Sequence, residues 1–177
     1  TAYEIVSRDW SSDVCSSDLS KRRQIISEIV TALKLIDGTQ ETLSGSPRSP
    51  YTFCTNIYTN AFAKQEYLGT INDFPSVYCY PISPETRERI GDAQVFSSFL
   101  LEVRGYIYSD DNSIEVSADL AQDIQYIIDS MKYRPTFKDL NVTECRVQSL
   151  STDEGIMEPY GVVEIRALIV YIQDYNI

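Results

Sequence analysis

The sequence predicts an α+β domain with two layers, in which a mostly antiparallel sheet of about five strands carries two helices on one face. Two observations lead to this class. Helical and extended patterns follow one another along the chain in the order helix, strands, helix, strands. In addition, residues 95–109 and 160–173 alternate apolar and other side chains with a period of two, which is typical of strands with one buried face. No internal repeat or domain boundary is visible, so residues 20–177 are predicted to form one domain.

The first predicted helix covers residues 21–36. Asp37 and Gly38 follow as a stop signal, because glycine readily takes the left-handed conformation that ends many helices. Residues 38–50 are rich in Gly, Ser, Thr and Pro and are expected to form a mobile loop. The apolar side chains of the helix recur with the 3.6-residue period and form one stripe, at Ile25, Ile29, Leu33 and Ile36.

Short extended segments are predicted next. Residues 51–60 and 76–80 combine aromatic and β-branched side chains and are expected to be strands. The pattern of residues 61–73, between them, is ambiguous. Residues 81–92 are polar and are expected to form a long loop or a hairpin arm that leads into the next strand.

A second helix is predicted over about residues 112–133. Asn112, with Glu115 three residues later, is typical of a helix start, and Pro135 is expected to end the helix. Its predicted buried face comprises Val116, Leu120, Ile124, Ile127, Ile128 and Met131.

Three long strands are predicted at residues 95–109, 141–150 and 160–173, and each carries Glu-x-Arg on the face opposite its apolar alternation. The pairs are Glu102/Arg104, Glu144/Arg146 and Glu164/Arg166. Period-two spacing places both members of a pair on one side of the sheet, so neighbouring strands in suitable register would form a lattice of opposite charges. Such a lattice is either a solvent-facing surface, where each pair contributes roughly 0–1 kcal/mol, or a surface that meets another subunit or lines a channel.

Residues 1–19 are predicted to be a translated sequencing adapter and not native protein. Two constant blocks of a widely used short-read indexing oligonucleotide translate, in one frame, to residues 1–5 and 9–19, and the three residues between them fit the variable index. The native part is therefore expected to begin near Ser20. The excluded residues include the only tryptophan, Trp10, and one of the four cysteines, Cys15.

Composition restricts the possible partners. The prefix holds four acidic residues and one arginine, so it supplies −3 of the net charge of −11 and leaves −8 for residues 20–177. An acidic chain is not expected to bind nucleic acid phosphates tightly, although it suits a surface that DNA passes without adhering.

The cysteines and the apolar runs indicate where the protein is made. Cys54, Cys79 and Cys145 are odd in number and far apart, which indicates reduced thiols in a protein made in the cytoplasm. No apolar run approaches the ~20 residues that a membrane-spanning helix needs.

No catalytic pattern is present in the sequence. The chain has no histidine, which is the commonest general base and metal ligand at neutral pH. It also has no Gly-rich phosphate loop, nucleophile elbow or Cys-x-x-Cys. Asp110-Asp111 and Asp153-Glu154 are acid pairs without the further ligands that Ca²⁺ or Mg²⁺ needs, and are interpreted as solvated turns. We therefore expect no enzyme, no catalytic residue, no metal and no cofactor.

The order of the segments resembles that of tail terminator and minor tail proteins of tailed bacteriophages. The resemblance covers most of residues 20–171, and its motifs are degenerate apolar patterns without catalytic residues. It rests on the opening helix at residues 21–33, on Phe74-Pro-Ser-Val-Tyr-Cys-Tyr-Pro81, on Leu100-Leu-Glu-Val-Arg-Gly-Tyr-Ile-Tyr108 with the following acidic turn and Leu120-Ala-Gln-Asp-Ile124, and on Gly161-Val-Val-Glu-Ile-Arg-Ala-Leu-Ile-Val-Tyr171.

The resemblance implies a structural virion protein at the head-proximal end of the tail, made in the cytoplasm of the bacterial host. It implies a homohexameric ring that caps the tail tube, contacts a neck or head-completion protein and lets DNA pass through its lumen without specific binding. The expected subunit contacts are the arm at Arg87, Glu88 and Arg89 and the polar sheet face with the three Glu-x-Arg pairs. A neck or head–tail joining protein, and a non-viral cytoplasmic α+β binding domain, remain alternatives.

Overall fold

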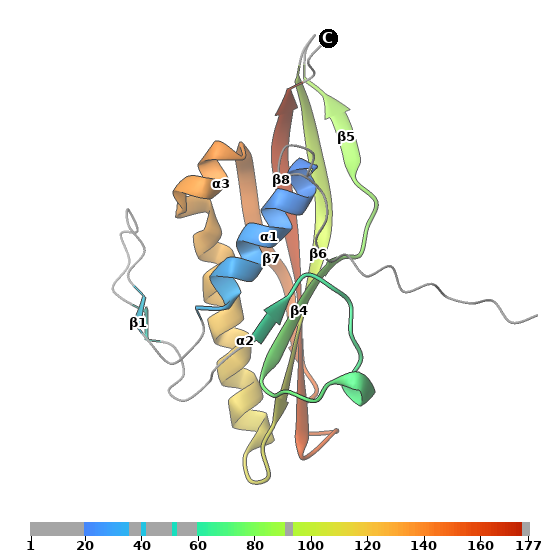
Figure 1. Cartoon of the computed structure of the whole chain (residues 1–177), viewed down its shortest axis with the longest axis vertical. Helices are drawn as coiled ribbons and strands as arrows, with labels where there is room; N and C mark the ends of the chain where they lie inside the picture. The colour runs from blue at the N-terminus through green and yellow to red at the C-terminus, as the bar shows by residue number, and fades with distance from the viewer. Residues whose placement is uncertain (1–19, 36–39, 42–50, 53–59, 91–93, 175–177) are drawn as a thin grey trace, which may run out of the picture.

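The structure is a computed structural model that describes residues 20–35, 40–41, 51–52, 60–90 and 94–174. It is an α+β fold with a mixed sheet and two main helices, which confirms the predicted class (Figure 1). The helices are α1 (Lys21–Leu33), α2 (Ser113–Ser130) and α3 (Pro135–Asp139), with 3-10 turns η1 (Leu68–Thr70) and η2 (Met131–Tyr133). The strands are β1 (Gln40–Glu41), β2 (Tyr51–Thr52), β3 (Asn60–Phe62), β4 (Ser76–Pro81), β5 (Thr86–Arg89), β6 (Gln94–Tyr108), β7 (Val142–Thr152) and β8 (Tyr160–Asp174).

The main sheet is organised around two long strands. Its order is β3-β4-β6-β8-β7, and β5 pairs with the part of β6 that β4 does not reach. β6 and β8 pair antiparallel from Gln94↔Asp174 to Tyr108↔Tyr160, so they form the central pair of the sheet. Every pairing in this sheet is antiparallel except that of β3 with β4, which is parallel. The described strands therefore number six in this sheet, one more than the approximate prediction, because the arm at residues 81–92 contains β5.

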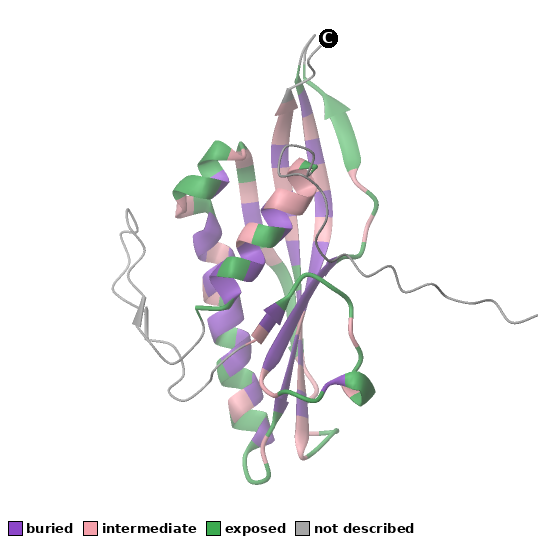
Figure 2. Ribbon diagram, in the orientation of Figure 1, coloured by how far each residue is buried: buried purple, intermediate pink, exposed green. Residues whose placement is uncertain are grey.

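One hydrophobic cluster contains the buried side chains of both main helices and those of one sheet face. The odd-numbered positions of β6 and β8, such as Phe99, Leu101, Ile165 and Ile169, belong to this cluster. The predicted apolar stripe of α2 belongs to it as well, with Val116 half-buried at its border. This shared membership supports the prediction that both helices cover one face of the sheet. The alternation of buried and half-buried positions along the strands is visible in Figure 2.

The opposite face, formed by even-numbered positions, is divided along its length. Near the ends of β6 and β8 where Tyr106 and Val162 lie, a second small cluster covers it with Ile71, Leu68 and Phe74 from the segment before β4. Tyr106 is therefore buried, and its hydroxyl donates a hydrogen bond to the carbonyl of Glu66 at 3.0 Å. The middle of this face carries charged side chains and its other end carries half-buried apolar ones.

Several helix and strand boundaries differ from the sequence predictions. Pro135 does not merely end the second helix, because it starts α3 at the first helical position, where its missing N–H costs nothing. Asn112 precedes α2 without a capping hydrogen bond, since its side-chain oxygen pairs with the Ser109 hydroxyl instead. The first helix ends at Leu33. The stop signal at 37–38, most of the loop at 38–50, the predicted strand residues 53–59 and the predicted adapter segment 1–19 lie outside the described residues.

Candidate functional site

The pairing of β6 with β8 brings two of the three Glu-x-Arg pairs together on the even-numbered sheet face. Glu102 lies directly opposite Arg166, and Arg104 lies directly opposite Glu164. Each charge therefore has an opposite charge across the strand pair and another two residues along its own strand. We call these four residues, Glu102, Arg104, Glu164 and Arg166, the charge lattice.

The ion pairs of the charge lattice run both across and along the strands. The Arg104 guanidinium lies 2.7 Å from the Glu102 carboxylate and 2.9 Å from that of Glu164. The Arg166 guanidinium lies 2.9 Å from Glu164 and 3.6 Å from Glu102. The lattice is electrically neutral, and each of its members has two opposite charges within ion-pair distance.

Exposure rises steeply across the charge lattice. The Glu102 side chain is 5% exposed and that of Arg104 is 23% exposed, whereas Glu164 and Arg166 reach 29% and 50%. Glu102 is closed off by Tyr80 of β4, whose hydroxyl donates a short hydrogen bond to its carboxylate. Burial, with that hydrogen bond to a carboxylate, raises the pKa of Tyr80 well above its ordinary value. The lattice thus has a buried, structural side and a side that other molecules can reach.

Tyr80 is a member of this site that sequence reasoning did not identify. The sequence places it in the predicted strand at residues 76–80 and in the segment Phe74–Pro81 that carries the family resemblance, without a site role. Its position follows from the register Tyr80↔Glu102 between β4 and β6, which no local pattern encodes. The available signal was the alternation of that strand, which places Tyr78 and Tyr80 on one face.

The third Glu-x-Arg pair lies on the same sheet but does not extend the charge lattice. Glu144 of β7 lies opposite Val170, and Arg146 lies opposite Leu168, so both face apolar partners on β8. The register of β7 shifts at two irregularities, between Val142 and Glu144 and between Val147 and Ser149, and the residues opposite the lattice are serines. Arg146 and Glu144 form their own ion pair at 2.5 Å, with side chains 61% and 40% exposed.

The predicted arm is divided between the two faces of the sheet. β5 pairs with β6 so that Glu88 lies opposite Phe96, on the face of the charge lattice, whereas Arg87 lies opposite buried Ser97. Arg89, two residues on, shares the side of Arg87. Arg87 binds the Glu85 carboxylate at 2.7 Å, and that carboxylate also accepts a hydrogen bond from the Tyr171 hydroxyl at 2.7 Å. Burial would raise the pKa of Glu85, but these two partners outweigh it and hold the pKa below its ordinary value.

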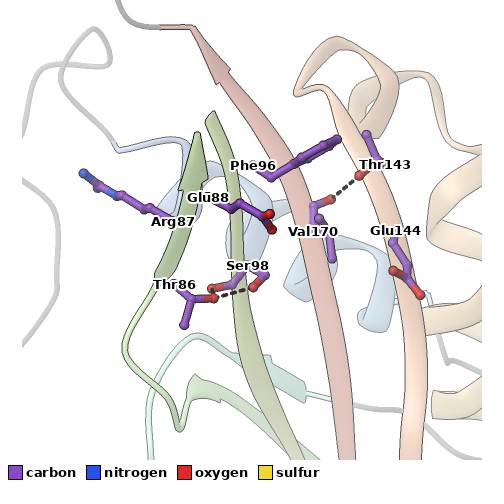
Figure 3. A pocket seen from close by; sticks show the side chains of 8 residues that line it. All are labelled: Thr86, Arg87, Glu88, Phe96, Ser98, Thr143, Glu144 and Val170. Atoms are coloured by element: carbon purple, nitrogen blue, oxygen red, sulfur yellow. Dashed lines mark hydrogen bonds between the residues drawn. The ribbon is translucent and has the colours of Figure 1, made fainter. Parts of the chain in front are cut away.

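A groove of about 660 Å³ lies between β5 and β7 on the face of the charge lattice. Figure 3 shows Glu88 and Arg87 leaving β5 in opposite directions, with Phe96 and Val170 on the strands between β5 and β7. Its lining combines apolar side chains with hydroxyl, carboxylate and guanidinium groups, namely Thr86, Arg87, Glu88, Phe96, Ser98, Thr143, Glu144 and Val170.

The acid pairs at the turns have structural partners. The Asp153 carboxylate accepts hydrogen bonds from the backbone N–H groups of Met157 at 3.2 Å and Val162 at 3.1 Å, and Asp110 accepts one from the Tyr108 hydroxyl at 2.6 Å. Among the described residues, no three His, Cys, Asp or Glu side chains are grouped so that they could hold a metal ion. No helix within the described ranges is long and apolar enough to cross a membrane.

The described residues define a small α+β protein that carries a set of ion pairs on one face of its sheet. Comparison with known families identifies it further. The chain belongs to the family described as Bacteriophage Tail Tube Terminator Protein, whose family model matches residues 20–176. The chain is also similar to the tail tube terminator protein p142 of Escherichia phage T5, with 26% identity over 148 residues, which cover 79% of this chain and 90% of the relative.

Family membership confirms the resemblance to tail terminators and assigns the chain a structural role in the tail of a phage virion. The match begins at the residue where the native part is predicted to begin. The adapter origin of residues 1–19 stays a prediction, as do the contact roles of the charge lattice, the Glu144/Arg146 pair and the arm.

Proposed function

We propose that this chain forms a homohexameric ring that caps the head-proximal end of the tail tube and joins it to a neck or head-completion protein. The observation that carries the proposal is the family match over residues 20–176, because it covers the whole described fold. The name of the T5 relative points to the same task at a tail tube. The action is mechanical: one side of the ring binds the last ring of the tube, and the other side cannot accept another tube subunit. No bond is made or broken, so we infer that the chain is not an enzyme.

The charge distribution supports contact between copies through the face of the charge lattice. Residues 20–177 carry a net charge of −8, so copies of the chain repel one another and a stable contact is favoured where the local charge is lowest. The lattice is neutral, and the neighbouring Glu144/Arg146 pair is neutral as well. In a closed ring one patch meets a different patch on the neighbour, and an ordered charge pattern fixes the orientation of that contact more than its affinity. The arm with Arg87, Glu88 and Arg89 is the second proposed contact.

Passage of DNA through the ring is consistent with the same charge. A ring built from acidic subunits repels the phosphate backbone at long range, so DNA can move through the lumen without being bound. The proposal therefore includes no specific DNA contact.

Oligomer size and tube capping test the proposal. The purified chain is expected to elute as a hexamer in size-exclusion chromatography with light scattering, and to stop the growth of tubes when it is added to polymerising tail tube protein of the same phage. Arg146→Glu, at a 61% exposed position of the sheet face, is expected to weaken the ring. Lys138→Glu on α3 is the matched control and is expected to leave the ring intact.

If the chain remains a monomer in the presence of tube ends, the proposal of a ring is wrong. Its position in a virion reconstruction separates a terminator from a neck protein, because a terminator contacts the last tube ring directly.

A further inference from the structure

The start of α2 and the turn between β7 and β8 lie together at one end of the molecule, away from the groove (Figure 1). The backbone N–H of Ser109 donates to the carbonyl of Pro159 at 2.9 Å, and the Ser113 hydroxyl donates to the Glu158 carboxylate at 3.4 Å. Ile114 packs so closely on Gly155 that a Cβ at that glycine would lie 2.8 Å from it. Residues 108–119 and 150–160 thus form one continuous surface, which we call the acidic tip.

Five large apolar side chains of the acidic tip are exposed, and three of them, Ile114, Ile156 and Met157, lie at the start of α2 or on the β7–β8 turn. Ile156 is 87% exposed, more than any other large apolar side chain of the described residues, and Ile114 and Met157 are 52% and 45% exposed. None of the three belongs to either hydrophobic cluster of the described residues. Contiguous exposed apolar side chains are typical of surfaces that another protein covers.

The turn that presents these side chains is held by its own hydrogen bonds. The Ile156 backbone N–H donates to the carbonyl of Asp153 at 3.1 Å, and the Tyr160 backbone N–H donates to that of Met157 at 2.9 Å. The Asp153 carboxylate adds the two backbone hydrogen bonds already described. Ile156 and Met157 are therefore presented by a preorganised turn, which lowers the entropic cost of binding a partner.

Charge defines the chemistry of that partner. The two segments of the acidic tip contain seven acidic residues and neither lysine nor arginine. Exposed Asp110, Asp111, Glu115, Glu154 and Glu158 surround the aliphatic side chains. Two such tips repel each other, so the complementary surface has to be an apolar recess bordered by lysine or arginine.

We propose that the acidic tip is the surface with which this chain docks on the end of the tail tube, inserting Ile114, Ile156 and Met157 into a basic-rimmed apolar recess of the tube protein. This inference rests on the proposed terminator function and assigns tube contact to a surface separate from the charge lattice. The neutral lattice serves contact between copies that share one charge, whereas the acidic tip requires a partner of opposite charge.

The experiment measures co-sedimentation of the full chain with tubes assembled from purified tail tube protein of the same phage. Ile114→Ser/Ile156→Ser is expected to weaken tube binding by about tenfold or more, as truncation of buried apolar contacts does in other interfaces. Asp111→Lys/Glu154→Lys is expected to weaken it to a similar extent and to reduce its dependence on salt. The matched controls are Leu35→Ser, at another exposed apolar residue, and Asp139→Lys, at an exposed acid of α3.

The outcomes separate the two proposals. Binding by the wild type and both controls, with loss in both tip variants at unchanged ring size, supports the inference. Wild-type affinity in the tip variants overturns the inference and leaves the terminator function intact. Loss of the ring in both tip variants assigns the tip to contact between copies and also overturns the inference. Absence of wild-type binding to the tube overturns the terminator function together with the inference.

Discussion

Replacement of Glu102 by glutamine is expected to be the most destabilising single change in the charge lattice. The substitution keeps the shape of the side chain but removes the charge that faces Arg104 at 2.7 Å, Arg166 at 3.6 Å and the Tyr80 hydroxyl. Removing one partner of a buried ion pair costs about 3–5 kcal/mol of unfolding free energy. Arg104 keeps Glu164 at 2.9 Å and is 23% exposed, so we expect about 3 kcal/mol. For a domain of this size that corresponds to a fall in Tm of about 6–12 °C.

Urea denaturation and thermal unfolding at one fixed protein concentration measure this loss, because oligomerisation makes stability depend on concentration. Glu144→Gln is the control, since it removes the same charge from a pair whose side chains are 40% and 61% exposed, and its expected cost is below about 1 kcal/mol. Equal losses of unfolding free energy in the two variants would refute the reasoning, because they would show that the burial of Glu102 does not increase the contribution of its ion pairs to stability.

Three further predictions concern packing, pH and thiol chemistry. Gly161→Ala is expected to lower the free energy of unfolding by more than about 2 kcal/mol, because its Cβ would lie 2.1 Å from the Ser117 hydroxyl and 2.7 Å from Ile107. Gly69→Ala is the control, since a Cβ there meets no atom within 4 Å and the change is expected to be neutral. Urea denaturation compares the two variants. The lowered pKa of Glu85 contributes stability that is present above its ordinary value of 4.5 and is lost as the pH falls through its folded value, so Glu85→Gln is expected to show a shallower loss of stability between about pH 5 and 3. Burial raises the pKa of Cys79 and raises that of Cys145 to about 12, so both are expected to resist iodoacetamide at pH 8 until urea unfolds the chain, as mass spectrometry of each cysteine can show.

The sequence predicted much of this fold because its long elements carry strong local patterns. The buried and exposed sides of β6 and β8 follow from period-two alternation, and the buried face of α2 follows from the 3.6-residue period. The short parallel pairing of β3 with β4 could not be predicted, because three residues carry no periodic pattern and their partner is decided by distant packing. The short helix α3 that begins at Pro135 was not predicted for a related reason, since a proline at the first turn of a helix and one after its last turn look the same in a local pattern.

The same division applies to the candidate site. The sequence by itself determined that Glu102/Arg104, Glu144/Arg146 and Glu164/Arg166 lie on sheet faces opposite the core, because side-chain direction in a strand is a local property. Only the tertiary structure decided that four of these residues meet, since register depends on the pairing of strands about 60 residues apart in the chain. It also decided that irregularities in β7 leave the third pair outside the lattice, that Tyr80 buries Glu102, and that the start of α2 meets the β7–β8 turn to form the acidic tip. Each of these depends on contacts between residues remote in sequence, where hydrogen-bond geometry and packing volume decide the outcome and local composition does not.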